Sequence, residues 1–280
     1  MRKLGLIAGG GGLPLEIAQV CTAAGRPLFV VRIKGSADKD LQDFPGADSG
    51  IAELGRSIKL LKQAGCEAVC FAGQVNRPDF ANLKPDLRGL VALPGVIAAA
   101  SRGDDELLRF MMGEFERDGF VVEGADQVVA ELAIGLGALG RFAPAEAHQL
   151  DIETAVRAAR ALGDLDIGQA AVSARGLVLA MEAAEGTAAL LTRVASLPIE
   201  LRGTTDAPVG VLAKVPKSRQ DRRVDLPTIG VDTVTAVAQA GLAGIVGEAG
   251  ALLVVDRAAT VKMADELGVF IAGLPATRTP

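Results

Sequence analysis

The stretch Lys3-Leu-Gly-Leu-Ile-Ala-Gly-Gly-Gly-Gly-Leu-Pro14 decides the fold class. Its first six residues form a mostly apolar run of strand length, and the glycines that follow turn the chain into a helix. We expect this helix to reach about Ala24 and to end at Gly25. A second apolar run, Leu28 to Ile33, predicts the next strand. Strand, glycine turn, helix and strand in this order predict an α/β protein with buried parallel strands.

The same alternation continues along the chain. We expect further strands at 67–72, 252–255 and 269–272, a hairpin around Arg175-Gly176, and helices from Leu54, from Gly103 and at 144–162, 181–194, 232–240 and 257–267. Glycines and a proline gather in residues 133–144, which we interpret as a linker. We therefore predict two α/β domains joined by a Gly-rich linker: a Rossmann-like nucleotide-binding domain, residues 1–133, and a catalytic domain, residues 144–280.

The glycine turn at 9–12 is a candidate ligand site. Such a turn directs backbone N–H groups and a helix N-terminus toward the place where a phosphate or sugar could bind. It does not match an NAD fingerprint, because Pro14 stands at the last glycine of G-x-G-x-x-G and Lys34 stands where an acid is needed. A tight turn that merely requires glycine explains the pattern equally well.

The densest polar stretch is the loop 214–230, which follows an apolar run that ends at Ala213. It holds Lys214, Lys217, Arg219, Arg222 and Arg223 beside Asp221 and Asp225. Pro216 and Pro227 stiffen it. Lysine and arginine neutralise phosphoryl oxygens, and aspartate suits Mg²⁺, so the loop predicts transfer or hydrolysis at phosphorus. The alternative is a solvated loop whose ion pairs contribute little. Farther back, Glu185 or Thr187 could reach a metal or phosphate, although capping alone would explain the threonine.

Composition excludes several function classes. The net charge is −5 and the chain has no Trp and no Tyr, so it offers no general nucleic-acid surface. His148 is the single histidine and suits a surface or capping role, which argues against histidine-based catalysis. Three cysteines in no zinc or redox spacing predict buried free thiols. The chain shows no signal sequence and no apolar run of membrane-spanning length, so we expect a cytoplasmic protein.

Several motifs together resemble a known family. They are Lys214-x-Pro-Lys-Ser-x-Gln-Asp-x-Arg-x-Asp-Leu-Pro-Thr-Ile-Gly230, Asp166-x-Gly-Gln169, Glu182-Ala-Ala-Glu-Gly-Thr187, Arg77-Pro78, Gly103-Asp-Asp105 and Gly9-x-Gly-x-Leu-Pro14. Through essentially its whole length the chain resembles the UDP-2,3-diacylglucosamine pyrophosphatases of lipid A synthesis in some Gram-negative bacteria. The resemblance implies a Mg²⁺-dependent hydrolase that places water on the α-phosphorus and yields UMP and 2,3-diacylglucosamine 1-phosphate (lipid X).

The resemblance also implies roles for individual residues. Asp225 matches the aspartate most closely tied to catalysis, as Mg²⁺ ligand or water-orienting group, with Asp221, Lys214 and Arg222 assisting and Glu185 as a second metal candidate. Gly11, Gly12, Gln74 and Val75 are candidates for the uridine half of the substrate, and Gln169, Thr187 and Arg223 for the rest. The resemblance further implies a homodimer with substrate between its domains. Contact with the membrane, at the inner face of the inner membrane, would be peripheral and through the lipid substrate.

One position departs from the family pattern, because Ala188 stands where the family usually has aspartate. If that aspartate is a metal ligand, this chain is impaired. If it is a first-turn cap, its loss costs about 1 kcal/mol of stability and activity survives.

Two rival functions remain from the sequence. An NADP-dependent oxidoreductase would use the glycine turn with Arg32 or Lys34 near a 2′-phosphate. A nucleotide-sugar binding protein would keep affinity without turnover.

Overall fold

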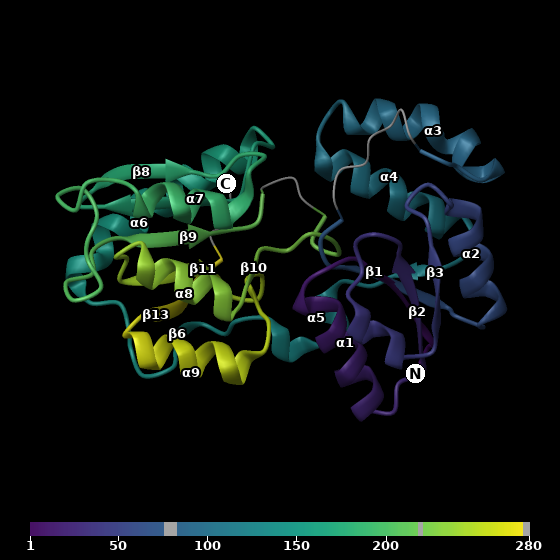
Figure 1. Ribbon diagram of the computed structural model, residues 1–280, viewed down its shortest axis with the longest axis horizontal. Helices are drawn as coiled ribbons and strands as arrows, with labels where there is room; N and C mark the ends of the chain where they lie inside the picture. The colour runs from purple at the N-terminus through teal and green to yellow at the C-terminus, as the bar shows by residue number, and fades with distance from the viewer. Residues whose placement is uncertain (76–82, 218–220, 277–280) are drawn as a thin grey trace. The chain divides into compact units, whose positions relative to one another are not determined.

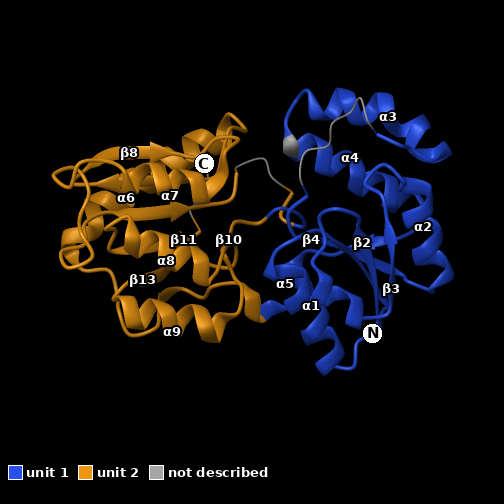
Figure 2. Cartoon of the chain, in the orientation of Figure 1, with its two compact units in different colours: residues 1–130, 223–225 blue, residues 131–222, 226–280 orange. Residues whose placement is uncertain are grey.

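The computed structural model describes residues 1–75, 83–217 and 221–276. The chain folds into two compact units (Figure 2). Unit 1 comprises residues 1–130 and 223–225, and unit 2 comprises residues 131–222 and 226–280. The polar loop therefore does not stay in one unit: three of its residues belong to unit 1, whereas the sequence assigned the whole loop to a catalytic domain of residues 144–280.

Unit 1 contains a five-stranded parallel sheet in the order β3-β2-β1-β4-β5 (Figure 1). The strands are β1 (Leu4–Ala8), β2 (Leu28–Ile33), β3 (Gly46–Ser49), β4 (Ala68–Ala72) and β5 (Val121–Val122). Every residue of β1 is buried. A continuous apolar strand is what a parallel sheet covered on both faces requires, because neither face meets water.

The described helices that accompany this sheet are α1 (Gly12–Ala23), α2 (Leu54–Gln63), α3 (Leu87–Ala100), α4 (Asp104–Arg117) and α5 (Ala125–Val128). Ile58 and Leu61 of α2, Ala92 of α3 and Phe115 of α4 pack into one core with Val31 of β2. α1 buries Ile17, Ala18 and Cys21. α1 begins at the end of the glycine turn at 9–12, and α2 begins after a turn in which Glu53 N donates to Gly50 O. The sequence therefore predicts where these two helices begin.

Unit 2 contains a six-stranded mixed sheet in the order β6-β13-β11-β9-β7-β8 (Figure 1). β9 (Val211–Lys214), β11 (Gly244–Glu248) and β13 (Phe270–Leu274) are parallel to one another. β6 (Gly137–Leu139) and β7 (Ala170–Ala174) run antiparallel to β13 and β9, and β8 (Leu177–Met181) pairs antiparallel with β7. β10 (Thr228–Ile229) and β12 (Leu253–Val254) form a separate parallel pair.

Helices cover both faces of the unit 2 sheet. α6 (Gln149–Asp164) packs Ala155 and Ala159 against Val211 and Val246 on one face. On the other face, α7 (Gly186–Ala195), α8 (Val231–Gln239) and α9 (Arg257–Leu267) share a core with Leu212 and Ile245. Unit 2 is thus a three-layer α/β structure.

Short 3₁₀ turns lie at Lys39–Asp43 in unit 1, at Ala130–Leu132 where unit 1 ends and unit 2 begins, and at Glu146–His148 in unit 2.

The structure confirms the α/β class and most predicted elements. The hairpin is present, and its loop residues Arg175 and Gly176 both have positive φ, as a two-residue type I′ turn requires. The Gly-rich linker is not confirmed, because Gly137–Leu139 pairs with β13 as an edge strand of unit 2. The sequence reading also missed β3, β11 and α3. Among the described residues, no helix is long and apolar enough to cross a membrane.

Candidate functional site

The first candidate site lies at the carboxyl ends of β1 and β4 in unit 1. The two loops that leave these strands are joined by hydrogen bonds: Gly10 N donates to Gln74 O at 2.8 Å, and Gln74 N donates to Gly10 O at 2.9 Å. The predicted residues Gly11, Gly12, Gln74 and Val75 are all exposed around this bridge. The structure therefore brings the four candidates for the uridine half to one edge. Arg77 and Pro78 lie outside the described residues.

Two of the glycines are required by the backbone. A Cβ on Gly9 would lie 2.4 Å from Gln74 O, so only glycine lets the two loops approach. Gly11 has φ +88°, which L side chains rarely adopt, and a Cβ there would meet nothing within 4 Å. Gly9 is therefore explained by packing, whereas Gly11 combines a backbone conformation that only glycine adopts without strain with open space above it.

Asp38 lies beside this turn, and the sequence analysis did not predict it as a site residue. Gly11 N donates to Asp38 Oδ2 at 2.7 Å, so a carboxylate already accepts the amide at the start of α1. Arg32 binds Asp48 Oδ1 at 2.7 Å, and Lys34 lies 3.6 Å from Glu53. These pairs argue against the oxidoreductase alternative, because Arg32 or Lys34 would have to receive a 2′-phosphate and the α1 N-terminus a pyrophosphate.

The second candidate site lies at the carboxyl edge of the parallel strands in unit 2. Lys214 ends β9 and Glu248 ends β11. Because β7 runs in the opposite direction, its beginning lies at the same edge: Ala170 pairs with Lys214, and Val215 N donates to Gln169 O at 3.0 Å. The predicted residues Lys214 and Gln169 are thus neighbours in the sheet.

Charged groups are held in fixed positions at this edge. Lys214 is only 8% exposed, and its Nζ donates to Thr228 O at 3.0 Å. Arg222 binds Glu248 Oε1 at 2.5 Å, and Lys217 binds Asp166 Oδ1 at 2.5 Å. These pairs carry little stabilisation where they are exposed, but they fix where the cations lie. Ser218, Arg219 and Gln220 lie outside the described residues.

Glu182 joins two of the predicted residues and was not itself assigned a role from the sequence. Its buried carboxylate accepts from Thr187 Oγ1 at 2.5 Å and from Gln169 N at 2.9 Å. Gln169 Oε1 is buried, and no hydrogen-bond donor reaches it from the part of the chain that the structure describes. A buried acceptor without a donor is costly, and because this oxygen is enclosed, a ligand can supply the donor only if the Gln169 side chain turns outward.

The two metal candidates belong to different units. Glu185 precedes α7 in unit 2 and binds Arg193 Nη2 at 2.6 Å. Asp225 belongs to unit 1, together with Arg223, which binds Glu116 Oε1 at 2.6 Å, and Val224, which packs on Met112. The catalytic set is divided in the same way, because Lys214, Asp221 and Arg222 belong to unit 2. Asp225 has φ +57°, a conformation that is unusual outside glycine and asparagine and that marks a constrained position.

The described residues contain no group of three His, Cys, Asp or Glu side chains that could hold a metal. Mg²⁺ in phosphoryl chemistry usually takes one or two carboxylates, with substrate oxygens and water completing its shell. Single carboxylates such as Asp225 and Glu185 are donors of the kind that Mg²⁺ accepts beside substrate oxygens, whereas the described residues offer no set of protein ligands that could hold a metal alone.

The remaining sequence predictions concern residues outside these edges. Ala188 is exposed in the first turn of α7. His148 Nδ1 accepts from Ala145 N at 2.9 Å, which confirms its capping role. All three cysteines are buried and free, and burial raises the pKa of each thiol, most of all that of Cys70. They take no part in either site.

Comparisons with known proteins agree over the whole chain. The family model described as the LpxI N-terminal domain matches residues 3–132, and the one described as the LpxI C-terminal domain matches residues 135–272. The chain is 56% identical over 280 residues, 100% of each sequence, to "UDP-2,3-diacylglucosamine pyrophosphatase LpxI" of Caulobacter vibrioides. The match to a solved structure, CobK precorrin-6A reductase, covers 100% of this chain and 91% of the reductase chain at 14% identity. Its TM-score of 0.33 is too low to support an argument. The two family models together span nearly all of the sequence, and the chain belongs to the LpxI family.

Proposed function

We propose that this chain is a UDP-2,3-diacylglucosamine pyrophosphatase of lipid A synthesis, which hydrolyses its substrate to UMP and 2,3-diacylglucosamine 1-phosphate. The observation that carries the proposal is the 56% identity, over the full length of both sequences, to a relative of that name. The two sheet edges add support, because one offers exposed backbone groups and the other offers fixed charges.

In this proposal the positive charge for the chemistry comes from the edge of unit 2, and the water-orienting carboxylate, Asp225, comes from unit 1. Cleavage of a phosphoanhydride needs charge neutralisation and an oriented water. Lys214 and Arg222 supply positive charge, and burial of Lys214 strengthens its field because little solvent screens it. Asp225 orients the attacking water and Asp221 assists. Gln169 Oε1 accepts from a hydroxyl or amide N–H of the acylated sugar, next to Thr187.

The uridine half belongs to the edge of unit 1. The order β3-β2-β1-β4-β5 is that of the first five strands of a Rossmann sheet, and ligands of such sheets bind where the order reverses beside the first strand. Gly11, Gly12, Gln74 and Val75 lie at that point. Since Asp38 already places a carboxylate on Gly11 N, we expect the uncharged base or ribose there rather than a phosphate.

Mg²⁺ is part of the proposal. When bound, it would neutralise diphosphate oxygens and lower the pKa of a coordinated water. Asp225 is the residue proposed to hold it, with Glu185 as a second candidate that would first have to release Arg193. We further propose a cytoplasmic homodimer that meets the inner face of the inner membrane.

The test is UMP release from UDP-2,3-diacylglucosamine, with Mg²⁺ and with chelator, by this chain and by Ala188→Asp in parallel. Release by both supports the reaction and makes position 188 dispensable. Release by the variant alone supports the reaction and assigns position 188 to the site. Release by neither, with substrate bound, would favour the binding-protein alternative, and saturable NADPH binding would favour the oxidoreductase. A rate that chelator leaves unchanged would remove Mg²⁺ from the proposal.

The phosphorus that is attacked needs its own test, because attack at either phosphorus gives the same two products. The family resemblance implies the α-phosphorus. In ¹⁸O-labelled water, attack at the α-phosphorus breaks its bond to the bridging oxygen and places the label in UMP. A label in 2,3-diacylglucosamine 1-phosphate would instead assign the attack to the β-phosphorus.

A further inference from the structure

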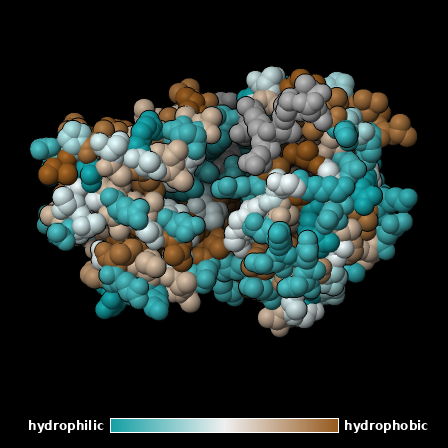
Figure 3. All heavy atoms as spheres, in the orientation of Figure 1, coloured by the Kyte–Doolittle hydropathy of each residue, from teal (hydrophilic) through white to brown (hydrophobic). Residues whose placement is uncertain are grey.

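α3 of unit 1 carries an apolar stripe on its outer surface. Leu87 is 86% exposed and Val91 is 82% exposed. They continue at helical spacing into a row of exposed apolar residues, which we call the α3 stripe: Leu87, Leu90, Val91, Pro94, Ile97 and Ala98. Figure 3 shows hydrophobic residues gathered over this helix, at the upper right. A helix that is apolar all round is normally buried on every side, and none of the described residues covers the outer surface of α3 in the way its composition calls for.

The opposite face of α3 holds the helix in place. Gly89, Ala92 and Ala99 are buried, and Gly95 lies so close to Phe110 of α4 that a Cβ there would be 2.5 Å from the ring. Asp86 caps the helix by accepting from Gly89 N at 2.7 Å. Because the inner face is packed and the start is capped, the stripe is fixed toward solvent.

Cations border the stripe. Lys84 precedes the helix and Arg102 follows it, and both are exposed. α3 itself contains no Asp, Glu or Lys, and its only charged residue is Arg88. Carboxylates also lie near the helix, but they are less exposed than these two cations. Glu114 and Asp118 are engaged by Arg88 and Arg117, Asp105 by Arg109, and Asp86 by the N–H groups of Arg56 and Gly89, while Glu106 of α4 is partly buried. An apolar row between cations is the pattern of a helix that lies in the surface of an anionic bilayer.

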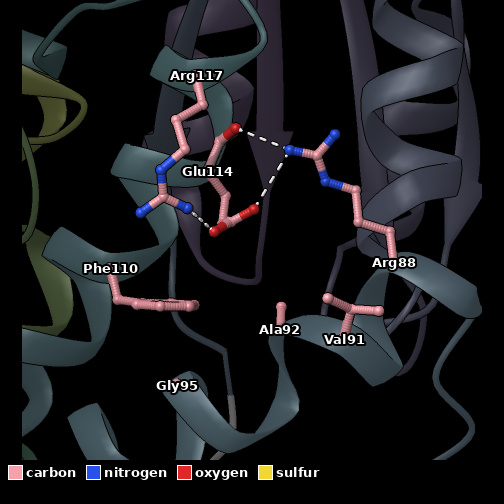
Figure 4. A pocket seen from close by; sticks show the side chains of 7 residues that line it. All are labelled: Arg88, Val91, Ala92, Gly95, Phe110, Glu114 and Arg117. Carbon is pink, nitrogen blue, oxygen red and sulfur yellow. Dashed lines mark hydrogen bonds and ion pairs between the residues drawn. The ribbon is translucent and has the colours of Figure 1, made fainter.

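A hollow opens beside the stripe, between α3 and α4 (Figure 4). Its volume is about 450 Å³. Val91, Ala92 and Phe110 line the apolar part, while Arg88, Glu114 and Arg117 form a paired group at one end (Figure 4). Val91 belongs to both the stripe and the hollow. Lipid chains reaching the stripe would therefore find apolar surface behind it and guanidinium groups at its rim.

We propose that the α3 stripe docks this chain directly on an anionic phospholipid bilayer, independently of substrate. The 14 residues of α3 span about 21 Å, too short to cross the roughly 30 Å hydrocarbon layer but sufficient to lie in its surface. A second copy is a poorer fit, since one helix offers a footprint on the order of 200 Å², against about 800 Å² per partner in a stable interface. The choice of a bilayer also rests on the proposed function, because a diacylated substrate resides there.

The test is cosedimentation of the full-length protein with vesicles of phosphatidylglycerol and phosphatidylethanolamine, without substrate. We compare the parent, Leu87→Gln/Val91→Gln and the control Leu136→Gln, which alters a 72% exposed leucine of unit 2. Glutamine keeps the net charge and suits a helix. We expect at least a fivefold lower bound fraction for the double variant and no change for the control. Lys84→Gln/Arg102→Gln should weaken binding to anionic vesicles and leave the little binding to phosphatidylcholine unchanged.

Activity separates this proposal from the proposed function. The double variant should hydrolyse detergent-dispersed UDP-2,3-diacylglucosamine at the parental rate and the same substrate in vesicles at least fivefold more slowly. A parent that does not bind anionic vesicles, or a double variant that binds as well as the parent, overturns the docking surface. A loss of dimer in sedimentation velocity with unchanged vesicle binding would assign the stripe to a second copy and overturn it too. If the parent protein fails to hydrolyse even detergent-dispersed substrate, the proposed function is overturned, while the result on vesicle binding stands.

Discussion

The carboxyl edges of the two sheets offer a ligand opposite chemistries. The edge in unit 1 consists mainly of backbone groups: glycine amides and carbonyls and the Gly10–Gln74 bridge, with one carboxylate, Asp38. The edge in unit 2 consists mainly of charged side chains: buried Lys214, the Arg222–Glu248 pair and the Lys217–Asp166 pair. Backbone groups recognise a ligand by its shape and hydrogen bonds, whereas charged side chains attract or neutralise phosphate. From this difference we propose that the uridine half is bound at the edge of unit 1 and that the positive charge acting on the diphosphate comes from the edge of unit 2, so that the two contributions can be altered separately.

Asp225→Asn should give the largest effect, because Asp225 is the residue proposed to orient the attacking water. It also crosses the comparison, since it folds with unit 1. Asparagine tolerates the positive φ and removes only the charge. We expect kcat to fall at least about 10³-fold with substrate affinity unchanged, measured by UMP release and equilibrium binding. Asp206→Asn, in an exposed loop, is the matched control. Near-parental turnover in Asp225→Asn would remove this residue from the mechanism.

Gly9→Ala sharpens the unit 1 side of the comparison. The new Cβ would lie 2.4 Å from Gln74 O, so the two loops must separate, at a cost of about 1–3 kcal/mol in the free energy of unfolding. Urea unfolding measures this cost, and UMP affinity should weaken as the edge opens. Gly135→Ala is the control, because its Cβ would meet nothing within 4 Å. Equal stabilities for the two variants would contradict the close approach at Gly9.

Glu182→Gln sharpens the unit 2 side. The glutamine oxygen can still accept from Gln169 N, and its NH2 group then donates to the Thr187 hydroxyl, so the variant reverses one hydrogen bond and removes the charge from both. A hydrogen bond to a charged group is worth about 1.5–3 kcal/mol and a neutral one about 1 kcal/mol, so we expect kcat/KM to fall by up to about tenfold. Glu200→Gln, at an exposed position of the same unit, should behave as the parent. Unchanged kinetics in Glu182→Gln would exclude Glu182 as a positioning residue.

Asp118→Asn should have the smallest effect and none on chemistry. The hydrogen bond from Lys62 and the charge of Arg88 hold the pKa of Asp118 below its usual range. Since the folded pKa lies below the unfolded value of about 3.9, the stabilisation is present above that pH and lost as the pH falls through the folded pKa. The variant should unfold more easily by up to about 1 kcal/mol at pH 7, and the difference should shrink as the pH falls below about 3.9 and vanish once the pH lies below the folded pKa. A constant difference across this range would contradict the assignment.

The sequence predicts the fold where local pattern and long-range packing agree. β1, β2 and α9 are apolar runs or amphipathic segments bounded by glycine, and their predicted limits match the structure closely. β11, Gly-Ile-Val-Gly-Glu, was missed because its two glycines give it weak strand propensity. They are needed there, since a Cβ on Gly244 would meet the Phe270 ring at 2.3 Å. Missing β11 also concealed Glu248, the partner of Arg222.

The candidate site was predictable as a list of residues and not as an arrangement. Lys214 and Gln169 stand far apart in sequence and are neighbours only because β7 runs antiparallel to β9. Thr187 is linked to Gln169 through Glu182, and nothing in the sequence says that the Glu182 carboxylate points at Gln169 N and Thr187. Asp38 lies five residues past β2, and no short motif connects it with Gly11. Such contacts depend on topology, which residue spacing does not encode.

The most direct test of the central claim measures UMP affinity and kcat in the same two variants, Gly11→Val and Lys214→Met. Valine is strained at φ +88° and fills the open space at the unit 1 edge, whereas methionine keeps the buried stem of Lys214 and removes its charge. We predict UMP binding at least tenfold weaker with kcat within threefold in Gly11→Val. In Lys214→Met we predict UMP affinity within twofold and kcat reduced about 10²- to 10³-fold. Both quantities falling together in each variant, or the pattern reversed, would contradict the division between a binding edge and a catalytic edge.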